Sequence, residues 1–250
     1  MKFITYLINL DDSAERLFGA TQQLQVAGID FERVPAFDGR NVQLADIKEY
    51  DEKASIAYMG RALGGGELGC YFSHIDCAKR LLQTDADYAL VLEDDMTAPQ
   101  TLLTSITEIL DYLEAHAIDW YLINIGAHKN KISTPVKQFH AHTLYKAHYF
   151  PMTTTGIIWS RKGAEAFLAY TQTHSIFCPV DNFFRYWLTE NNKGLSVYPP
   201  LTPPSGADSD IDSTVRRKTA NRHPLYGLIK QRRLWGDKLK ALRSKYLSTS

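Results

Sequence analysis

The chain has 250 residues, of which 44% are hydrophobic and 12% aromatic, and its 28 Lys and Arg balance 28 Asp and Glu. This composition excludes an intrinsically disordered chain, and no apolar run approaches the ~18 residues that span a bilayer. The charge balance hides an asymmetry, because residues 1–214 carry 17 basic and 27 acidic residues (net −10) whereas residues 215–250 carry 11 basic residues and one acid (net +10). We therefore expect an acidic folded body, 1–214, and a basic tail, 215–250.

Strands and helices are predicted to alternate along the body. The apolar run Phe3–Asn9 predicts a strand, cap residues at 11–13 begin a helix that Gly28 ends, and 31–34 is a second strand, so the chain opens with a β-α-β unit and a parallel pair. Further helices are expected at about 44–50, 67–83, 102–115, 161–171 and from Asp181 to about 190, and further strands at 88–92, 120–125, 157–159 and 195–198. This alternation predicts an α/β sheet.

Three consecutive acids, Glu93, Asp94 and Asp95, follow the apolar strand at 88–92. Open α/β sheets bind ligands at the carboxyl ends of their strands, and adjacent carboxylates repel one another unless a cation or solvent offsets their charge. In an extended segment Glu93 and Asp95 point the same way. They are therefore suited to one hard cation, Mg²⁺ or Mn²⁺, together with phosphate oxygens; the alternative is a solvated acidic loop that caps the next helix.

The segment 66–74 reads Gly-Glu-Leu-Gly-Cys-Tyr-Phe-Ser-His. Gly69 inside a helix costs about 1 kcal/mol relative to Ala, which suggests close packing or the approach of a ligand. Ser73 and His74 suit hydrogen bonds to a sugar or a phosphate. The alternative is a plain helix start, with Glu67 at the positive end of the helix dipole and a histidine in the core.

Two acidic features lie closer to the C-terminus. Asp181 stands at the start of an expected helix, where it is either a cap or a general base whose ionised form the helix dipole favours. The stretch Asp208–Asp212, Asp-Ser-Asp-Ile-Asp, is an acidic loop or a metal-binding one, although it lacks the Gly and the distal Glu of an EF-hand.

Taken in order, these segments resemble glycosyltransferase family 25, the lipooligosaccharide galactosyltransferase family, from residue 3 to about residue 212. The resemblance rests on Tyr6–Asp11 with Arg16, Gly28–Ile29, Arg33–Gly39, Gly66–Cys70 with Ser73–His74, Leu90–Asp95, Gly156–Ser160, Pro179–Asp181 and Asp208–Ile211. Each segment alone is weak, and the ordered set is specific. The chain departs from the family pattern at Asp12 and Leu17, where the family usually or often has Arg.

The resemblance implies a GT-A-like, Rossmann-type mixed sheet flanked by helices. It also implies an inverting transferase that moves a hexose, most commonly galactose from UDP-galactose, onto a lipooligosaccharide or lipopolysaccharide sugar in β linkage. The implied cofactor is Mn²⁺ or Mg²⁺ on Asp95 and Glu93, and Asp181 is the implied general base. The residues implied to contact the donor are Asn9, Leu10, Arg16, Asp38, Gly39, Glu67, Ser73, His74, Glu93 and Asp94.

The basic tail has the pattern of an amphipathic helix. Leu228, Trp235, Leu239, Leu242 and Tyr246 are spaced by 7, 4, 3 and 4 residues, which puts them on one helical face among Lys and Arg. Such helices lie on anionic membrane surfaces, so we expect the tail to bind the inner membrane where a lipid-linked acceptor lies. The alternatives are a solvated helix packed on the acidic body and, less favoured, nucleic-acid binding, for which no reader motif is present.

The expected location is the cytoplasmic face of a bacterial inner membrane. The N-terminus lacks the small-residue cleavage site of a signal peptide, and three cysteines without a CxxC pair suit a reducing compartment and disfavour a structural zinc. Two rival functions stay open. One is a metal-dependent nucleotidyltransferase, although the Gly run 64–66 lacks the P-loop Lys; the other is a non-enzymatic membrane-binding or nucleic-acid-binding module that acts through the tail.

Overall fold

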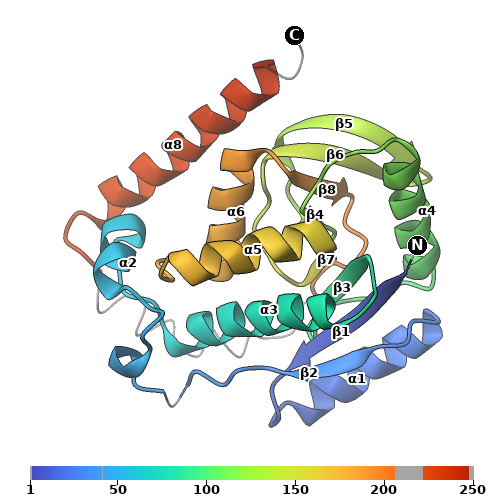
Figure 1. Ribbon diagram of the computed structural model, residues 1–250, viewed down its shortest axis with the longest axis horizontal. Coiled ribbons are helices and arrows are strands. Elements are labelled where there is room, and N and C mark those ends of the chain that lie inside the picture. The colour runs from blue at the N-terminus through green and yellow to red at the C-terminus, as the bar shows by residue number, and fades with distance from the viewer. Residues whose placement is uncertain (1, 41, 206–221, 248–250) are drawn as a thin grey trace.

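The computed structural model describes residues 2–40, 42–205 and 222–247. Eight strands form one mixed sheet in the order β2-β1-β3-β7-β4-β8-β6-β5 (Figure 1). The strands are β1 (Phe3–Asn9), β2 (Glu32–Pro35), β3 (Tyr88–Glu93), β4 (Leu122–Asn124), β5 (Lys131–Phe139), β6 (His142–Tyr149), β7 (Gly156–Ser160) and β8 (Gly194–Tyr198). β1 pairs in parallel with both β2 and β3, so the carboxyl ends of these three strands meet at one edge. β7 runs antiparallel between β3 and β4.

Helices cover both faces of the sheet. They are α1 (Ala14–Val26), the short 3₁₀ helix η1 (Leu44–Asp46), α2 (Glu52–Met59), α3 (Gly65–Gln83), α4 (Leu102–Ala115), α5 (Arg161–Thr173), α6 (Val180–Asn191) and α8 (Tyr226–Leu247). Buried side chains of α3, α5 and α6 belong to one core cluster, and those of α1 and α4 belong to the other. The predicted α/β class, with a mixed sheet flanked by helices, is therefore confirmed.

The strands that lead to the acidic turn are buried on both faces. In β3, Ala89 and Val91 face the α3 side while Leu90 and Leu92 face the α4 side, and all four are at most 1% exposed. Successive side chains of a strand alternate between faces, so an unbroken apolar run is what a central strand with helices on both sides requires. This burial fixes the position of β3 and therefore of Glu93, the last residue of the strand.

Most predicted elements match the structure to within a few residues, and two regions differ. Residues 52–59 form helix α2 inside a segment expected to be largely irregular. The helix ends at Gly60, whose left-handed backbone conformation is common at helix C-termini. Residues 131–149 form the β5–β6 hairpin, which no pattern predicted because β5 has no buried residue and carries Pro135. β6 joins β8, so the hairpin extends the sheet at its edge, where a proline is tolerated.

The predicted tail helix is present as α8, which lies along α2 and α6 and beside the β5–β6 hairpin (Figure 1). Asp237 and Ala241 are buried against the body, and Lys240 pairs with Glu190 of α6. Arg233 lies 5.2 Å from the ring centroid of Tyr58 on α2. Of the helices that the structure describes, none combines the length and hydropathy that crossing a bilayer requires. The expected boundary at residue 214 falls outside the described residues.

Candidate active site

A cavity of about 100 Å³ lies at the carboxyl ends of β1 and β3. Parallel strands of an open α/β sheet present their ligand sites at this end. Its wall is formed by residues 8–10, Arg16, 36–40, Gly66, Cys70, Ser73 and 93–95. Most of the residues expected to contact a donor are therefore brought together here: Asn9, Leu10, Arg16, Asp38, Gly39, Ser73, Glu93 and Asp94, with Asp95 beside them.

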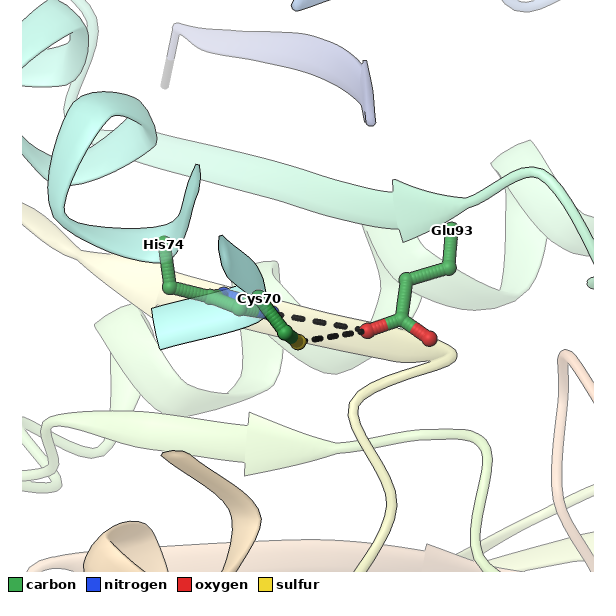
Figure 2. Close-up of side chains that lie close together, drawn as sticks. All are labelled: Cys70, His74 and Glu93. Atoms are coloured by element: carbon green, nitrogen blue, oxygen red, sulfur yellow. Dashed lines mark hydrogen bonds and ion pairs between the residues drawn. The ribbon is translucent and has the colours of Figure 1, made fainter. Parts of the chain in front are cut away.

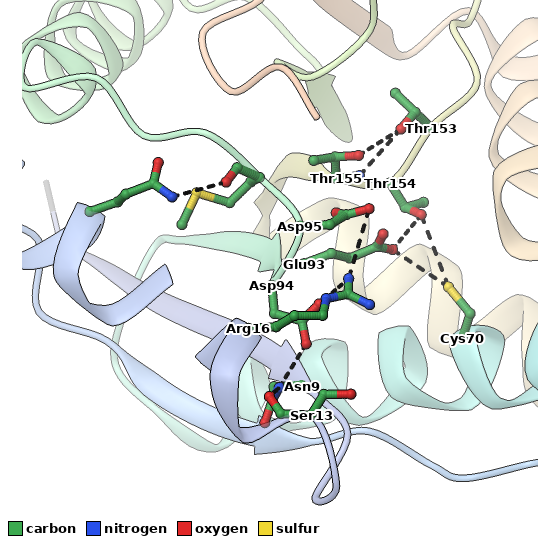
Figure 3. Close-up of polar contacts among 12 residues, drawn as sticks. Asn9, Ser13, Arg16, Cys70, Glu93, Asp94, Asp95, Thr153, Thr154 and Thr155 are labelled. Carbon is green, nitrogen blue, oxygen red and sulfur yellow. Dashed lines mark hydrogen bonds and ion pairs between the residues drawn. The ribbon is translucent and has the colours of Figure 1, made fainter. Parts of the chain in front are cut away.

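Asp94 is held by the first β-α turn (Figure 3). Its Oδ2 accepts a hydrogen bond of 2.7 Å from Asn9 Nδ2, and Arg16 forms an ion pair with its Oδ1. Asn9 is in turn fixed by Arg33, whose Nε donates to Asn9 Oδ1 at 3.0 Å. The charge of Asp94 is thus neutralised inside the protein, and this link ties the start of α1 to the end of β3.

Asp95 is in a different position. Its Oδ1 is buried and has no hydrogen-bond partner among the described residues, and Arg16 stays 3.9 Å from its Oδ2. Burial, with the nearby charge of Glu93, raises the pKa of Asp95 to about 6. A divalent cation at this carboxylate would coordinate the unpaired oxygen and offset the free-energy cost of ionising the buried Asp95 beside Glu93. The residues present therefore fit the hard cation predicted from the sequence.

Glu93 turns toward α3, where Thr154 and Cys70 donate to its Oε1 and His74 lies close by (Figures 2 and 3). Thr154 Oγ1 lies at 2.6 Å and Cys70 Sγ at 3.6 Å, whereas His74 Nε2, at 3.7 Å, is beyond hydrogen-bond distance. Burial by itself raises the pKa of Glu93, but the nearby His74 and the hydrogen bonds from Thr154 and Cys70 outweigh it and leave the pKa below its ordinary value. Burial and the charge of Glu93 raise the pKa of the Cys70 thiol, so the thiol stays protonated in the metal-free protein.

Cys70, His74 and Glu93 also have the geometry of a cation site. Their ligand atoms lie within 4.8 Å of one another, and neither ring nitrogen of the fully buried His74 has a hydrogen-bond partner among the described residues. Thiolate and imidazole are ligands that suit zinc, whereas Mg²⁺ and Mn²⁺ prefer oxygen. The structure thus offers an oxygen ligand for a hard cation at Asp95 and a sulfur ligand for a softer cation at Cys70, and Glu93 lies between them.

Two residues expected at the donor do not line the cavity. Glu67 forms a buried ion pair with Arg61, with contacts of 2.6 and 2.8 Å, and also accepts from the backbone N–H of Gly64 at 2.9 Å. It therefore closes the N-terminus of α3 as a capping residue. His74 is fully buried, and it reaches the cavity only through Glu93.

The turn at 36–40 packs against α3 with backbone in contact with backbone. A Cβ atom at Gly69 would lie 2.3 Å from the carbonyl oxygen of Phe37, and one at Gly39 would lie 1.9 Å from that of Gly65. Ser73 Oγ completes the contact by accepting from the Phe37 N–H at 3.0 Å. The glycine noted in the sequence is therefore required by close packing of this turn, which carries Asp38 and the half-exposed Phe37 to the cavity.

Asp181 lies in the first turn of α6 and is not part of the cavity wall. Its Oδ1 accepts from both the backbone and the side-chain nitrogen of Asn182, at 2.6 and 2.9 Å. Burial raises the pKa of Asp181, and its charge contributes to the raised pKa of Cys70, which is part of the wall. The acidic stretch Asp208–Asp212 lies outside the described residues.

Arg40 and Thr154 were not anticipated as site residues. Arg40 pairs with Asp38 at 2.8 Å and with Asp12 at 2.6 Å, and its hydrogen bonds lower the pKa of Asp38 to about 2. Thr154 belongs to a run of three threonines before β7 that the sequence shows without indicating a partner. No sequence pattern links Cys70 to the site, because its partner Glu93 is 23 residues away in the chain.

An open mixed α/β sheet with acids and a cavity at the carboxyl ends of its parallel strands is the arrangement of a ligand-binding α/β enzyme. The family model described as "Glycosyltransferase family 25 (LPS biosynthesis protein)" matches residues 3–184, and the chain belongs to this family. The family is the one that the sequence resemblance indicated, and the curated relatives of the chain include galactosyltransferases.

The similarity to these relatives is moderate and partial. Procollagen galactosyltransferase 1 of Danio rerio is 26% identical over 186 residues, 72% of this chain and 30% of the relative. Procollagen galactosyltransferase 2 of Homo sapiens is 26% identical over 218 residues, 80% of this chain and 34% of the relative. The chain thus spans about a third of the length of these relatives. The crystal structure of S. aureus TarS 1–349 is 14% identical, with a TM-score of 0.47, over all of this chain and 73% of that one.

Proposed function

We propose that the protein is a metal-dependent, inverting hexosyltransferase that moves galactose from UDP-galactose onto a sugar of a lipooligosaccharide or lipopolysaccharide, forming a β linkage. The observation that carries the proposal is the cavity that gathers the acidic turn 93–95, Asn9 and the 36–40 turn, with a buried carboxylate oxygen on Asp95 that no other described residue satisfies. The carboxylates of the acidic turn suit a cation, and Arg16 beside them suits the diphosphate of a nucleotide. Membership of a family with galactosyltransferase relatives supports the choice of sugar.

In this reading Asp95 and Glu93 hold Mn²⁺ or Mg²⁺ and the remaining wall holds the nucleotide. When bound, the cation stabilises the charge that develops on the departing diphosphate. Arg16 adds positive charge beside Asp95, and Phe37 offers an exposed aromatic face to the nucleotide base. Asp94, already paired with Arg16 and Asn9, holds the carboxyl end of β3 next to that of β1.

We assign the general base to Asp181. Inversion requires the acceptor hydroxyl to attack from the face opposite the leaving group, with a carboxylate that removes its proton; such help is worth ~10²–10⁴ in rate. A buried carboxylate with a raised pKa is a better proton acceptor than an exposed one. Its position at the start of α6 places it in a helix dipole that favours the ionised form.

We further propose that α8 holds the enzyme on the cytoplasmic face of an anionic inner membrane, where a lipid-linked acceptor lies. The face of α8 that turns away from the body is the apolar one: Leu228, Trp235, Leu239 and Tyr246 are 59–70% exposed and Leu242 is 37% exposed. At 3.6 residues per turn, Arg232 and Arg243 border this face on one side and Lys238 and Lys245 on the other. Basic residues around an exposed Trp and Leu stripe suit the interface of an anionic bilayer.

The proposal is tested by a thermal-shift panel of UDP-sugars, CTP and ATP, each with and without Mn²⁺. Stabilisation by one UDP-hexose only in the presence of the metal is the expected result, because a ligand that binds the folded state raises the unfolding temperature. A response to CTP or ATP in place of UDP-sugars would favour the nucleotidyltransferase. The absence of any nucleotide response would contradict both enzymes.

A further inference from the structure

A second cavity, of about 240 Å³, has a positively charged wall. Lys129 and Lys131 precede and begin the β5 strand, Arg185 projects from α6, and His128 stands beside them. The described residues that form this wall include neither Asp nor Glu. On a body whose residues 1–214 carry a net charge of −10, a cavity with three cations and no acid is a distinct electrostatic feature.

Within the described part of the chain, these cations form no ion pairs. Among the described residues, no carboxylate oxygen lies within 4.0 Å of the side-chain nitrogens of Lys129, Lys131 or Arg185. Arg185 is nevertheless held in place, since its Nε donates to the carbonyl oxygen of Phe150 at 2.9 Å and its guanidinium carbon lies 4.4 Å from the ring centroid of Tyr149. Burial lowers the pKa of Arg185, so an anion in the cavity would offset the cost of keeping its charge there.

The second cavity borders the candidate active site. Thr153 lines it, and the next residue, Thr154, donates to Glu93 in the wall of the first cavity. Thr153 has a left-handed backbone (φ 105°) and is fixed by a 2.8 Å hydrogen bond from Asn124 Nδ2 to its carbonyl oxygen. The segment 153–155 therefore lies between the two cavities. Figure 3 shows its three threonines beside the acidic turn.

The second cavity also adjoins the assigned base. Arg185 lies four residues after Asp181 on α6, so the two side chains share one face of the helix. Their charges interact, because Asp181 opposes the lowering of the Arg185 pKa. A sugar bound in this cavity would thus lie beside both the assigned base and the donor cavity.

We propose that this second cavity is the acceptor subsite and that it recognises an anionic group, a carboxylate or a phosphate, on the acceptor sugar. The inference rests on the proposed function, because it takes the first cavity as the donor site. Arg185 supplies a planar, immobilised donor for a bidentate contact. Lys129 and Lys131, which are exposed, add attraction for anions that approach the mouth of the cavity.

The test is a binding titration in excess UDP, which fills the phosphate-binding part of the first cavity. The probes are glucose, glucuronic acid, glucose 6-phosphate and inorganic phosphate, and binding is measured by saturation-transfer NMR or calorimetry. We expect glucuronic acid or glucose 6-phosphate to bind about tenfold more tightly than glucose, as a charge-assisted contact provides. The arm that responds distinguishes a carboxylate from a phosphate on the sugar.

The variant for this test is Lys129→Glu/Lys131→Glu, and the matched control is Lys48→Glu/Lys79→Glu. All four lysines are exposed, so both proteins should fold, and the change in net charge is the same. The preference for the anionic sugar should disappear in the first variant and remain in the control. The inference is overturned if neither anionic sugar binds more tightly than glucose, if the preference survives in the first variant, or if inorganic phosphate alone binds as tightly as the sugar phosphate.

Failure of the inference is distinguishable from failure of the proposed function. Binding of the probes needs no transfer, so a preference for anionic sugars in a protein that responds to no UDP-hexose would leave the anion site standing and remove the transferase assignment. Conversely, transfer to a neutral sugar with equal efficiency in the wild type and in Lys129→Glu/Lys131→Glu would leave the transferase standing and remove the anion subsite.

Discussion

Replacing two apolar side chains at the centre of the exposed face of α8 should release the protein from anionic membranes. Trp235 and Leu239 are 59% and 62% exposed. Burying an apolar side chain fully is worth ~1.5–3 kcal/mol, so the area still available on each contributes about 1–2 kcal/mol when it enters the interface. The variant Trp235→Ser/Leu239→Ser should therefore lose about 3 kcal/mol of membrane binding, which is roughly a hundredfold change in the partition constant.

The assay is co-sedimentation with vesicles of phosphatidylcholine, with and without phosphatidylglycerol. The wild type should bind the anionic vesicles preferentially, and binding should weaken as salt screens the flanking Lys and Arg of α8. The matched control is Phe18→Ser/Val26→Ser on α1, whose side chains are similarly exposed at 65% and 63% but have no basic border of this kind. Because all four positions are exposed, neither variant should change the unfolding temperature much.

Two results would refute this reasoning. Equal binding by Trp235→Ser/Leu239→Ser and the wild type would show that the apolar face of α8 does not enter the bilayer. Equal loss of binding in the α1 control would show that exposed apolar area in general, and not this helix, drives the association.

Three further predictions concern the site. Asp181→Asn should lower kcat by ~10²–10⁴ with donor binding kept, and near-normal turnover in this variant would remove the assignment. Because burial raises the pKa of Asp181, the kcat of the wild type should fall as pH falls through that raised pKa. Asp95→Ala should abolish the Mn²⁺ dependence of UDP-hexose binding in calorimetry while Cys70→Ser keeps it; the opposite pattern would move the cation to the Cys70, His74 and Glu93 group. Gly69→Ala should destabilise the protein by ~1–3 kcal/mol in urea unfolding, because the new Cβ meets the 36–40 turn. Gly19→Ala, whose Cβ enters open space, should stabilise the protein by about 1 kcal/mol. A change of the same sign in the free energy of unfolding of both variants would contradict the packing argument.

Local sequence patterns were sufficient for the elements that reach the site. Tyr88–Leu92 is an unbroken apolar run, and Phe3–Ile8 is interrupted only by Thr5. Polar residues follow both runs, and burial on both faces requires that composition. Because parallel strands end at the same edge, Asn9 and the acidic turn could be expected close together before any coordinates. The β5–β6 hairpin shows the limit of this reasoning, since β5, an edge strand without a buried residue, has no apolar period to detect.

The sequence by itself determined the family and the α/β class, because both follow from the order of short local patterns along the chain. It also determined the acidic turn at the end of β3 and the amphipathic character of α8, because each depends on residues close together in the chain. Only the tertiary structure decided the surroundings of the acids: Asp94 pairs with Arg16, Glu93 lies beside His74, and one Asp95 oxygen has no partner among the described residues. Three adjacent carboxylates look equivalent in a sequence. They become different because the strand ends at Glu93 and the chain turns at Asp94 and Asp95. Each carboxylate therefore meets whichever distant segment the packing of the sheet and helices brings there.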